Sequence, residues 1–221
     1  MTQNQRAYVR IFARFERFWH WVQALLVLTL LFTGGVLHGL VAAVPWKFAF
    51  VAHLGAAIAL VVLWIFAIFW HFTTGEWRQY LPTLNGLGAV IRFYAYGIFR
   101  GEAHPAKPTI RRKHNPLQRL SYLFLKLVIN PAIWITGVAY LSVNLSGLPL
   151  ATVAWAHVVA AYAMATFVVV HLYMATTGET VGAYLRAMLT GYEWVEVDDE
   201  RPSGAASDRL TAVVTADEGP Q

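Results

Sequence analysis

Residues Ala154–Glu179 read AWAHVVAAYAMATFVVVHLYMATTGE, and this stretch decides the fold class. It is apolar almost throughout, yet it contains two histidines, His157 and His171. At 1.5 Å per residue, the apolar run is long enough to cross about 30 Å of hydrocarbon. Burying an imidazole there costs free energy unless the ring is hydrogen-bonded or binds a metal. The two histidines therefore need a structural or a chemical reason.

The composition of the whole chain also indicates a membrane protein. Hydrophobic residues make up 57% of the 221 residues and charged residues 13%, whereas soluble domains carry about a quarter charged residues. The sequence has no cysteine, which excludes disulfides, iron–sulfur clusters and covalently attached haem. The net charge of +5 reports membrane topology, and the sequence has no motif for binding nucleic acid.

Four apolar runs are predicted to span the membrane: Phe18–Leu37, Trp46–Phe72, Leu120–Val143 and Leu150–Thr176. Arginines precede the first run, and basic residues fill the linker between the second and third. Lys47 is the only basic residue in the two short linkers. The positive-inside rule therefore predicts that both termini and the long linker are cytoplasmic. The predicted fold is an all-α membrane protein, a four-transmembrane-helix bundle whose first span is a retained helix.

Two further segments have a recognisable pattern. In the long linker Leu87, Val90, Ile91, Tyr94 and Ile98 fall at helical spacing. This predicts a short helix that either lies on the membrane surface or packs on the bundle. After Glu193 the chain becomes acidic and then rich in Ser, Ala and Gly. We predict one transmembrane domain over residues 1–195 and a disordered cytoplasmic tail over residues 196–221.

Spans two and four carry the same sequence marks. His53 and His157 both follow an alanine, and both lie eight residues after a proline. Thr-Thr-Gly-Glu also occurs at both 73–76 and 176–179. Because the two spans run in the same direction, His53 and His157 are predicted to lie at one depth, the outer layer.

A second, inner layer follows from helical periodicity. His157 and His171 are 14 residues apart, so they share a helix face and lie about 21 Å apart along the axis. His53 and His71 are 18 residues apart and also share a face. The inner layer therefore holds His171 with either His20 or His71, and spacing leaves this choice open.

Histidines facing one another in two layers suit haem, which needs two axial ligands and an apolar slot. A lone histidine in a span is more often a structural group bonded to a neighbouring helix, but four in two layers favour ligation. The sequence lacks the clustered ligands of zinc sites. Carboxylates such as Glu16, Glu76 and Glu179 fall only at the ends of the spans, which disfavours a proton channel or transporter.

Several of these residues together resemble the bacterial cytochrome b561 family. They are Phe18-Trp19-His20-Trp21, His53, the pair His157 and His171, and the linker segment His114-Asn115-Pro116-Leu117-Gln118-Arg119. The group includes b-type subunits of membrane-bound nickel–iron hydrogenases, formate dehydrogenase gamma subunits and thiosulfate reductase cytochrome b subunits. The resemblance covers about residues 8–195, and segments 71–77 and 187–193 look most like the thiosulfate reductase branch.

The resemblance implies two haem b groups with histidine axial ligands to each iron. His20 and His171 would hold the cytoplasmic haem, which selects His20 where spacing left two choices. His53 and His157 would hold the other haem.

The resemblance also implies a quinone site near the cytoplasmic haem, formed by Asn115 and Gln118. Amide donors suit a quinone carbonyl because reduction builds negative charge on its oxygen. Asn115 and Pro116 are also typical of a helix start, and the two roles are compatible. His71 either lines this pocket or has a structural role.

Together these expectations define one function. The protein is predicted to be a membrane-anchoring di-haem cytochrome b subunit of the bacterial inner membrane, within an oxidoreductase complex. It would carry electrons between menaquinone or ubiquinone on the cytoplasmic side and a periplasmic redox subunit. That partner would be an iron–sulfur/molybdenum reductase, a hydrogenase or a multihaem c-type cytochrome. The alternative is a haem-free, histidine-bearing membrane transporter or anchor. The direction of electron flow and the role of His38 stay open.

Overall fold

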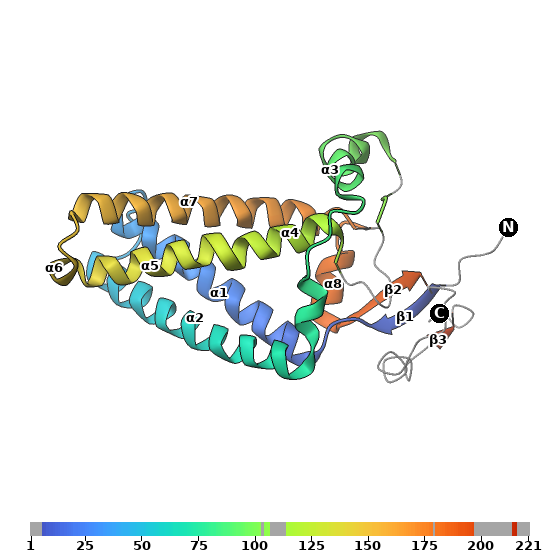
Figure 1. Cartoon of the computed structure of the whole chain (residues 1–221), viewed down its shortest axis with the longest axis horizontal. Helices are drawn as coiled ribbons and strands as arrows, with labels where there is room; N and C mark the ends of the chain where they lie inside the picture. The colour runs from blue at the N-terminus through green and yellow to red at the C-terminus, as the bar shows by residue number, and fades with distance from the viewer. Residues whose placement is uncertain (1–5, 103, 107–113, 179, 197–213, 216–221) are drawn as a thin grey trace. The chain divides into compact units, whose positions relative to one another are not determined.

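The computed structural model describes residues 6–102, 104–106, 114–178, 180–196 and 214–215. Its helices include four long apolar segments, each long enough to cross a membrane. They are Arg14–Leu37 (α1), Trp46–Thr74 (α2), Pro116–Leu141 (α4, η3 and α5) and Leu150–Ala175 (α7) (Figure 1). The predicted four-span helical fold is confirmed, and the third span begins at Pro116, slightly before the predicted start.

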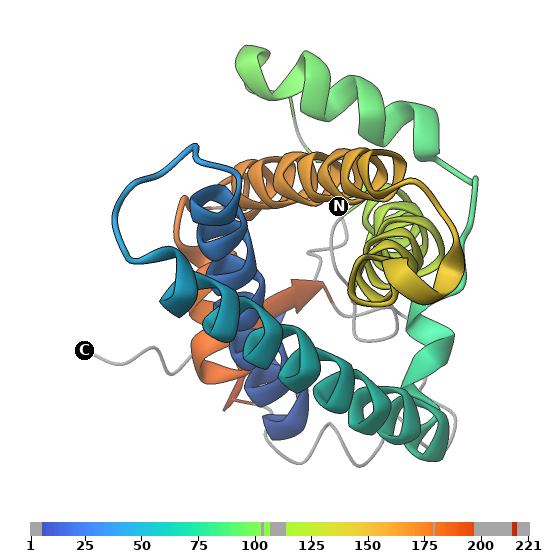
Figure 2. The same cartoon turned by 90° about the vertical axis from the view of Figure 1, so that its left-hand side faces the viewer.

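The chain divides into two compact units. One is Ala13–Trp77, in which α1 and α2 pack together as a helical hairpin. The other combines Met1–Phe12 with Arg78–Gln221, and in it α5 (Asn130–Leu141) runs beside α7 (Figure 2). In each hairpin we call the end with the tight connection, at residues 38–45 or 142–149, the short-linker end. The opposite end is the long-linker end.

Prolines and glycines set the ends of these helices. Pro45 and Pro149 directly precede α2 and α7, where the missing N–H of proline costs no helical hydrogen bond. Gly75 ends α2 with a φ of 75°, a left-handed conformation that closes many helices and favours glycine. At the start of α1 the backbone N–H of Ala13 donates to Glu16 Oε2 at 2.6 Å.

The third span is not a uniform α-helix. After α4 (Pro116–Phe124) the chain passes through a π-helical turn, Leu125–Ile129 (η3), before α5 begins. Pro131 lacks an N–H donor and its ring crowds the carbonyl one turn back, so a wider turn relieves the clash. The short helix α6 (Val143–Ser146) then leads to the reversal into α7.

Smaller elements gather at the long-linker end of the second unit. They are η1 (Glu76–Tyr80, which starts in the first unit), α3 (Leu87–Ala95), η2 (Gly97–Arg100) and α8 (Ala183–Thr190). The predicted linker helix is therefore present as α3. Its buried residues Val90, Phe93 and Tyr94 pack against Met174 of α7, which supports the packed alternative. Ile91 of the predicted apolar stripe is 46% exposed.

A small antiparallel sheet departs from the all-α prediction. β1 (Arg6–Arg10) lies between β2 (Tyr192–Glu196) and β3 (Val214–Thr215). Tyr8 of β1 stacks on Tyr192 of β2 with ring centroids 5.5 Å apart. The segment before α1 therefore lies on the same side as the segment after α8, although which side of the membrane this is stays a prediction. The predicted tail is largely outside the described residues, at 197–213 and 216–221.

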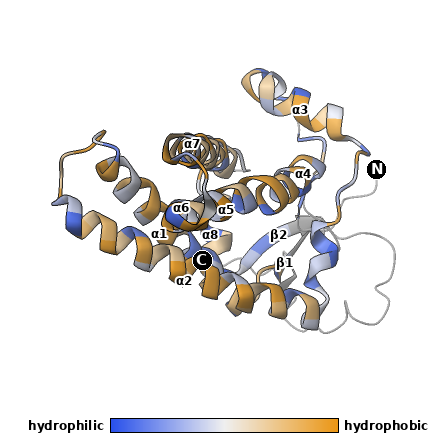
Figure 3. Ribbon diagram, turned by 60° about the vertical axis from the view of Figure 1, so that its left-hand side comes forward, coloured by the Kyte–Doolittle hydropathy of each residue, from blue (hydrophilic) through white to orange (hydrophobic). Residues whose placement is uncertain are grey.

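The outer surfaces of the spans are apolar (Figure 3). Leu25, Ile65, Ile135 and Val169, one from each span, have exposed fractions of 66%, 63%, 69% and 67%. Large apolar side chains exposed over so wide an area would be unfavourable in water, whereas lipid chains contact them without cost. The apolar surface and the lengths of the helices therefore both indicate that these segments lie in a membrane.

Candidate haem and quinone sites

In the second unit His157 of α7 contacts two adjacent residues of α5. Thr136 Oγ1 lies 3.0 Å from His157 Nδ1. A Cβ added to Gly137 would lie 3.5 Å from His157 Cε1, which is ordinary van der Waals contact. The imidazole is thus bonded at one ring atom and packed close to the α5 backbone at the next.

In the first unit His53 of α2 has the same surroundings. Thr33 Oγ1 of α1 lies 2.9 Å from His53 Nδ1, and a Cβ on Gly34 would lie 3.5 Å from His53 Cε1. Sequence reasoning missed both Thr-Gly pairs. A signal was available, because Thr33 and Thr136 precede their histidines by 20 and 21 residues, so the repeat extends to spans one and three.

The other two predicted ligands lie farther along the same hairpins. His171 shares α7 with His157, about 21 Å away by helix rise, and stacks on Phe167 with an interplanar angle of 7°. His20 is 13 residues from Thr33 along α1, or about 20 Å, and contacts Trp21 edge-to-face. Each unit, taken alone, therefore carries imidazoles at two levels about 20 Å apart.

His71 has different surroundings from the four predicted ligands. Its Nδ1 lies 2.6 Å from the carbonyl of Ala67, and Trp19 and Trp70 contact the ring edge-to-face at 5.4 and 5.1 Å. The residue is 6% exposed, whereas His20, His53, His157 and His171 are all half-buried. These contacts support the structural role that the sequence left as one of two alternatives.

Asn115 and Gln118 cap the start of α4. Asn115 Oδ1 accepts from the backbone N–H of Gln118 at 2.9 Å, and Gln118 Oε1 accepts from the backbone N–H of Asn115 at 2.9 Å. This reciprocal pair is the amide form of a capping box, so the helix-start prediction is confirmed. Asn115 Nδ2 also donates to the Tyr94 hydroxyl at 3.2 Å. A primary amide has two N–H donors, and this bond uses one of them.

Tyr94 links these amides to α7. His104 Nε2 lies 3.1 Å from its hydroxyl, and the Tyr173 hydroxyl donates to the Tyr94 carbonyl at 3.0 Å. Burial raises the pKa of Tyr94 above its ordinary value, so the hydroxyl stays protonated at neutral pH. Tyr173 lies two residues after His171 on α7, so the two residues lie at nearly the same level along the helix axis, on opposite faces of the helix.

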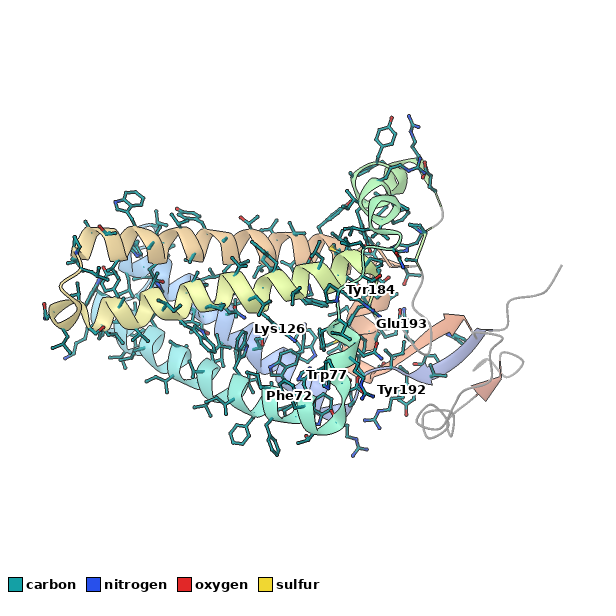
Figure 4. The ribbon with its side chains drawn as sticks, viewed as in Figure 1. Phe72, Trp77, Lys126, Tyr184, Tyr192 and Glu193 are labelled. Atoms are coloured by element: carbon teal, nitrogen blue, oxygen red, sulfur yellow. The ribbon has the colours of Figure 1, made fainter. Side chains whose placement is uncertain are left out.

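A lysine inside the third span was also missed. Lys126 lies in the π-helical turn (Figure 4), and its Nζ sits 3.7 Å from the centroid of the Tyr80 ring. His114 and Tyr122 contact each other and Tyr80, with ring centroids 5.1 to 5.9 Å apart. The aromatic face partly stabilises the charge of an ammonium at membrane depth. A single lysine within an apolar run was a visible signal for such a site.

Two other expectations concern metals and His38. Within the part of the chain that the structure describes, no three His, Cys, Asp or Glu side chains gather into a metal site. His38 is the C-terminal cap of α1 at the short-linker end.

The fold and the histidines define a membrane protein built from two helical hairpins with matched imidazole sites. Residues 11–191 match the family model for prokaryotic cytochrome b561, and the chain belongs to this family. It is therefore a multi-pass inner-membrane cytochrome with b-type haem that functions in electron transfer. The resemblance predicted from the sequence is confirmed at the level of the family.

A relative in Escherichia coli (strain K12) carries the name "Putative cytochrome YdhU". It is 28% identical over 193 residues, which cover 83% of this chain and 74% of the relative. No solved structure matches the chain. The thiosulfate reductase branch stays a prediction.

Proposed function

We propose that this protein is a di-haem cytochrome b subunit that anchors an oxidoreductase complex in the membrane. It carries electrons between the quinone pool at the cytoplasmic side and a periplasmic oxidoreductase or cytochrome. The observation that supports this most strongly is the spacing of imidazoles at two levels about 20 Å apart in each hairpin. A hydrocarbon core of about 30 Å separates the two surfaces, so two levels suit exchange of electrons at both.

Four histidines would hold the two haems. His53 and His157 would bind one iron, and His20 and His171 the other. The residues fit the group, because the imidazoles lie half-buried on apolar spans and a haem slot needs both features. Haem iron bound there would take up and release single electrons.

The polar cluster at the long-linker end of the second unit is the proposed quinone site. Asn115 and Gln118 would orient a quinone by donating amide N–H groups to a carbonyl oxygen. The Tyr94 hydroxyl lies between Asn115 and His104 and would hold a proton close to that oxygen. His71 stays an alternative lining residue, although its contacts with two tryptophans and a carbonyl support a structural role.

The short-linker end would receive the redox partner. His38 lies there at the end of α1 and would contact that partner. The partner class is an iron–sulfur/molybdenum reductase, a hydrogenase or a multihaem c-type cytochrome, and membrane lipid covers the apolar flanks.

The test is the haem content of the purified full-length protein. We expect two b haems per chain by the pyridine haemochrome assay, both reduced by menaquinol or ubiquinol analogues. A folded chain with no haem would favour the alternative, a histidine-bearing transporter or anchor. One haem per chain would contradict the two-level assignment, and two haems that quinols cannot reduce would contradict the quinone site.

A further inference from the structure

We infer that Thr33 and Thr136 are positioning residues that fix the tautomer and the ring orientation of His53 and His157. The inference rests on the proposed function of these two histidines as haem ligands. It concerns the threonines, which neither the family match nor the sequence prediction singles out.

The direction of the Thr33–His53 hydrogen bond follows from counting protons. A threonine hydroxyl carries one proton and two lone pairs. Thr33 Oγ1 lies 2.7 Å from the carbonyl of Thr29, one turn back on α1. A carbonyl only accepts, so the hydroxyl proton points to Thr29. The 2.9 Å contact with His53 is then a bond that Nδ1–H donates to the hydroxyl oxygen.

The same count of protons applies to Thr136 and His157 in the second unit. Thr136 Oγ1 lies 2.6 Å from the carbonyl of Ala132, which takes the hydroxyl proton. His157 Nδ1, at 3.0 Å, must therefore donate. In both units a neutral imidazole protonated at Nδ1 carries its lone pair on Nε2, and that lone pair is what a metal ion takes.

The opposite tautomer would break this chain of hydrogen bonds. An imidazole protonated at Nε2 would need Thr33 to turn its proton from the Thr29 carbonyl towards Nδ1. Inside an apolar span no water replaces the lost bond, so the two linked bonds support each other. The helical back-bond of the threonine therefore sets the tautomer of a histidine on a different helix.

The glycine after each threonine fixes the ring from a second side. Gly34 and Gly137 bring the neighbouring backbone close to Cε1 of His53 and His157. Bonding at Nδ1 and packing at Cε1 hold two adjacent ring atoms from one helical turn. This leaves the ring little freedom to rotate.

The bond would also tune the iron of a bound haem. An Nδ1–H that donates to an acceptor makes the imidazole a stronger base, which favours the oxidised iron and lowers the reduction potential. Removing the acceptor should therefore raise the midpoint potential of the affected haem and weaken its retention. Because His53 and His157 are assigned to one haem, both threonines should act on the same haem.

The experiment compares Thr33→Val and Thr136→Val, which keep the shape and remove the hydroxyl, with Thr33→Ser and Thr136→Ser, which keep it. Thr166→Val is the matched control, because its hydroxyl bonds a carbonyl one turn back and it takes no part in either chain of hydrogen bonds. The readouts on the purified full chain are the potential of each haem, the low-spin ferric electron paramagnetic resonance spectrum and the haem content.

We expect each valine variant to raise the potential of one haem, the same one in both cases, and to change its ferric spectrum. Retention of that haem should fall roughly ten-fold. The serine variants should restore the parental values, and the control variant should keep them. Should the valine variants fail to accumulate, Thr33→Ala and Thr136→Ala give the same comparison with serine.

Two outcomes overturn the inference in distinguishable ways. If the valine variants leave both potentials and both ferric spectra unchanged, or if the control shifts as much, the threonines have no positioning role. The haem assignment would survive that result. If His53→Ala and His157→Ala each keep both haems, the proposed ligands are wrong, and the role of the threonines is lost with them.

Discussion

The two helical hairpins agree at the short-linker end and differ at the long-linker end. Near the short-linker end, the histidine of each hairpin makes the same contacts at nearly the same distances. His53 contacts Thr33 and Gly34, and His157 contacts Thr136 and Gly137. At the second level, His20 lies against Trp21 while His171 stacks on Phe167. The matched contacts of His53 and His157 indicate that both histidines need the same ring orientation. The contacts of His20 and His171 differ because their neighbouring residues differ.

The difference extends to the helices themselves. α2 is continuous and carries His71 between two tryptophans. The third span instead passes through a π-helical turn with Lys126 over the Tyr80 ring. The α5–α7 hairpin also carries the Asn115–Gln118 capping box and Tyr94 at its long-linker end. One hairpin is thus a plain scaffold for histidines, and the other combines that scaffold with a polar cluster.

The largest expected effect would test the agreement between the hairpins. His53→Ala and His157→Ala should each remove one haem, and the double variant should remove no more than either single variant, because both histidines are assigned to one iron. Haem content per chain and low-temperature absorbance spectra measure this. Loss of different haems in the two single variants would contradict the assignment of His53 and His157 to the same haem.

An intermediate effect would sharpen the difference at the long-linker end. His20→Ala should remove the second haem, whereas His71→Gln should keep both haems. It should lower the free energy of unfolding by about 1–3 kcal/mol, because a buried, hydrogen-bonded imidazole is lost. Haem content and a thermal melt in detergent give the two readouts. If His71→Gln lost a haem while His20→Ala kept both, the assignment in the inner layer would have to be exchanged.

The smallest expected effect concerns the polar cluster that distinguishes the second hairpin. Asn115→Ala should slow the reduction of haem by quinol analogues about ten-fold through the loss of one hydrogen bond, and it should cost about 1 kcal/mol of folding stability through the lost helix cap. Asn115→Ser is the matched control, because serine keeps the cap but has no amide donor. We expect parental stability and slow quinol reduction in the serine variant. Parental kinetics with serine would show that Asn115 acts only as a cap.

Much of this architecture could be predicted from local sequence. The four spans follow from runs of apolar residues, since length and transfer free energy decide which segments cross a bilayer. The predicted shared depth of His53 and His157 follows from their equal distances in sequence from Pro45 and Pro149. The capping role of Asn115 was likewise visible in the four residues that form it.

Other features needed the tertiary structure because they depend on how one helix is rotated and how closely it approaches another. The sequence alone determined which segments are apolar and long enough to cross a membrane and which family the chain resembles, and it predicted which histidines share a depth. Only the folded hairpins showed that Thr33 and Thr136 reach Nδ1 of His53 and His157. The tertiary structure also decided three other features. They are the pairing of β1 with β2, the contacts of His71 with Trp19, Trp70 and the Ala67 carbonyl, and the packing of α3 on α7. The physical reason is that hydropathy and helical periodicity act within one segment, whereas a hydrogen bond between helices requires two distant segments to meet within about 3 Å.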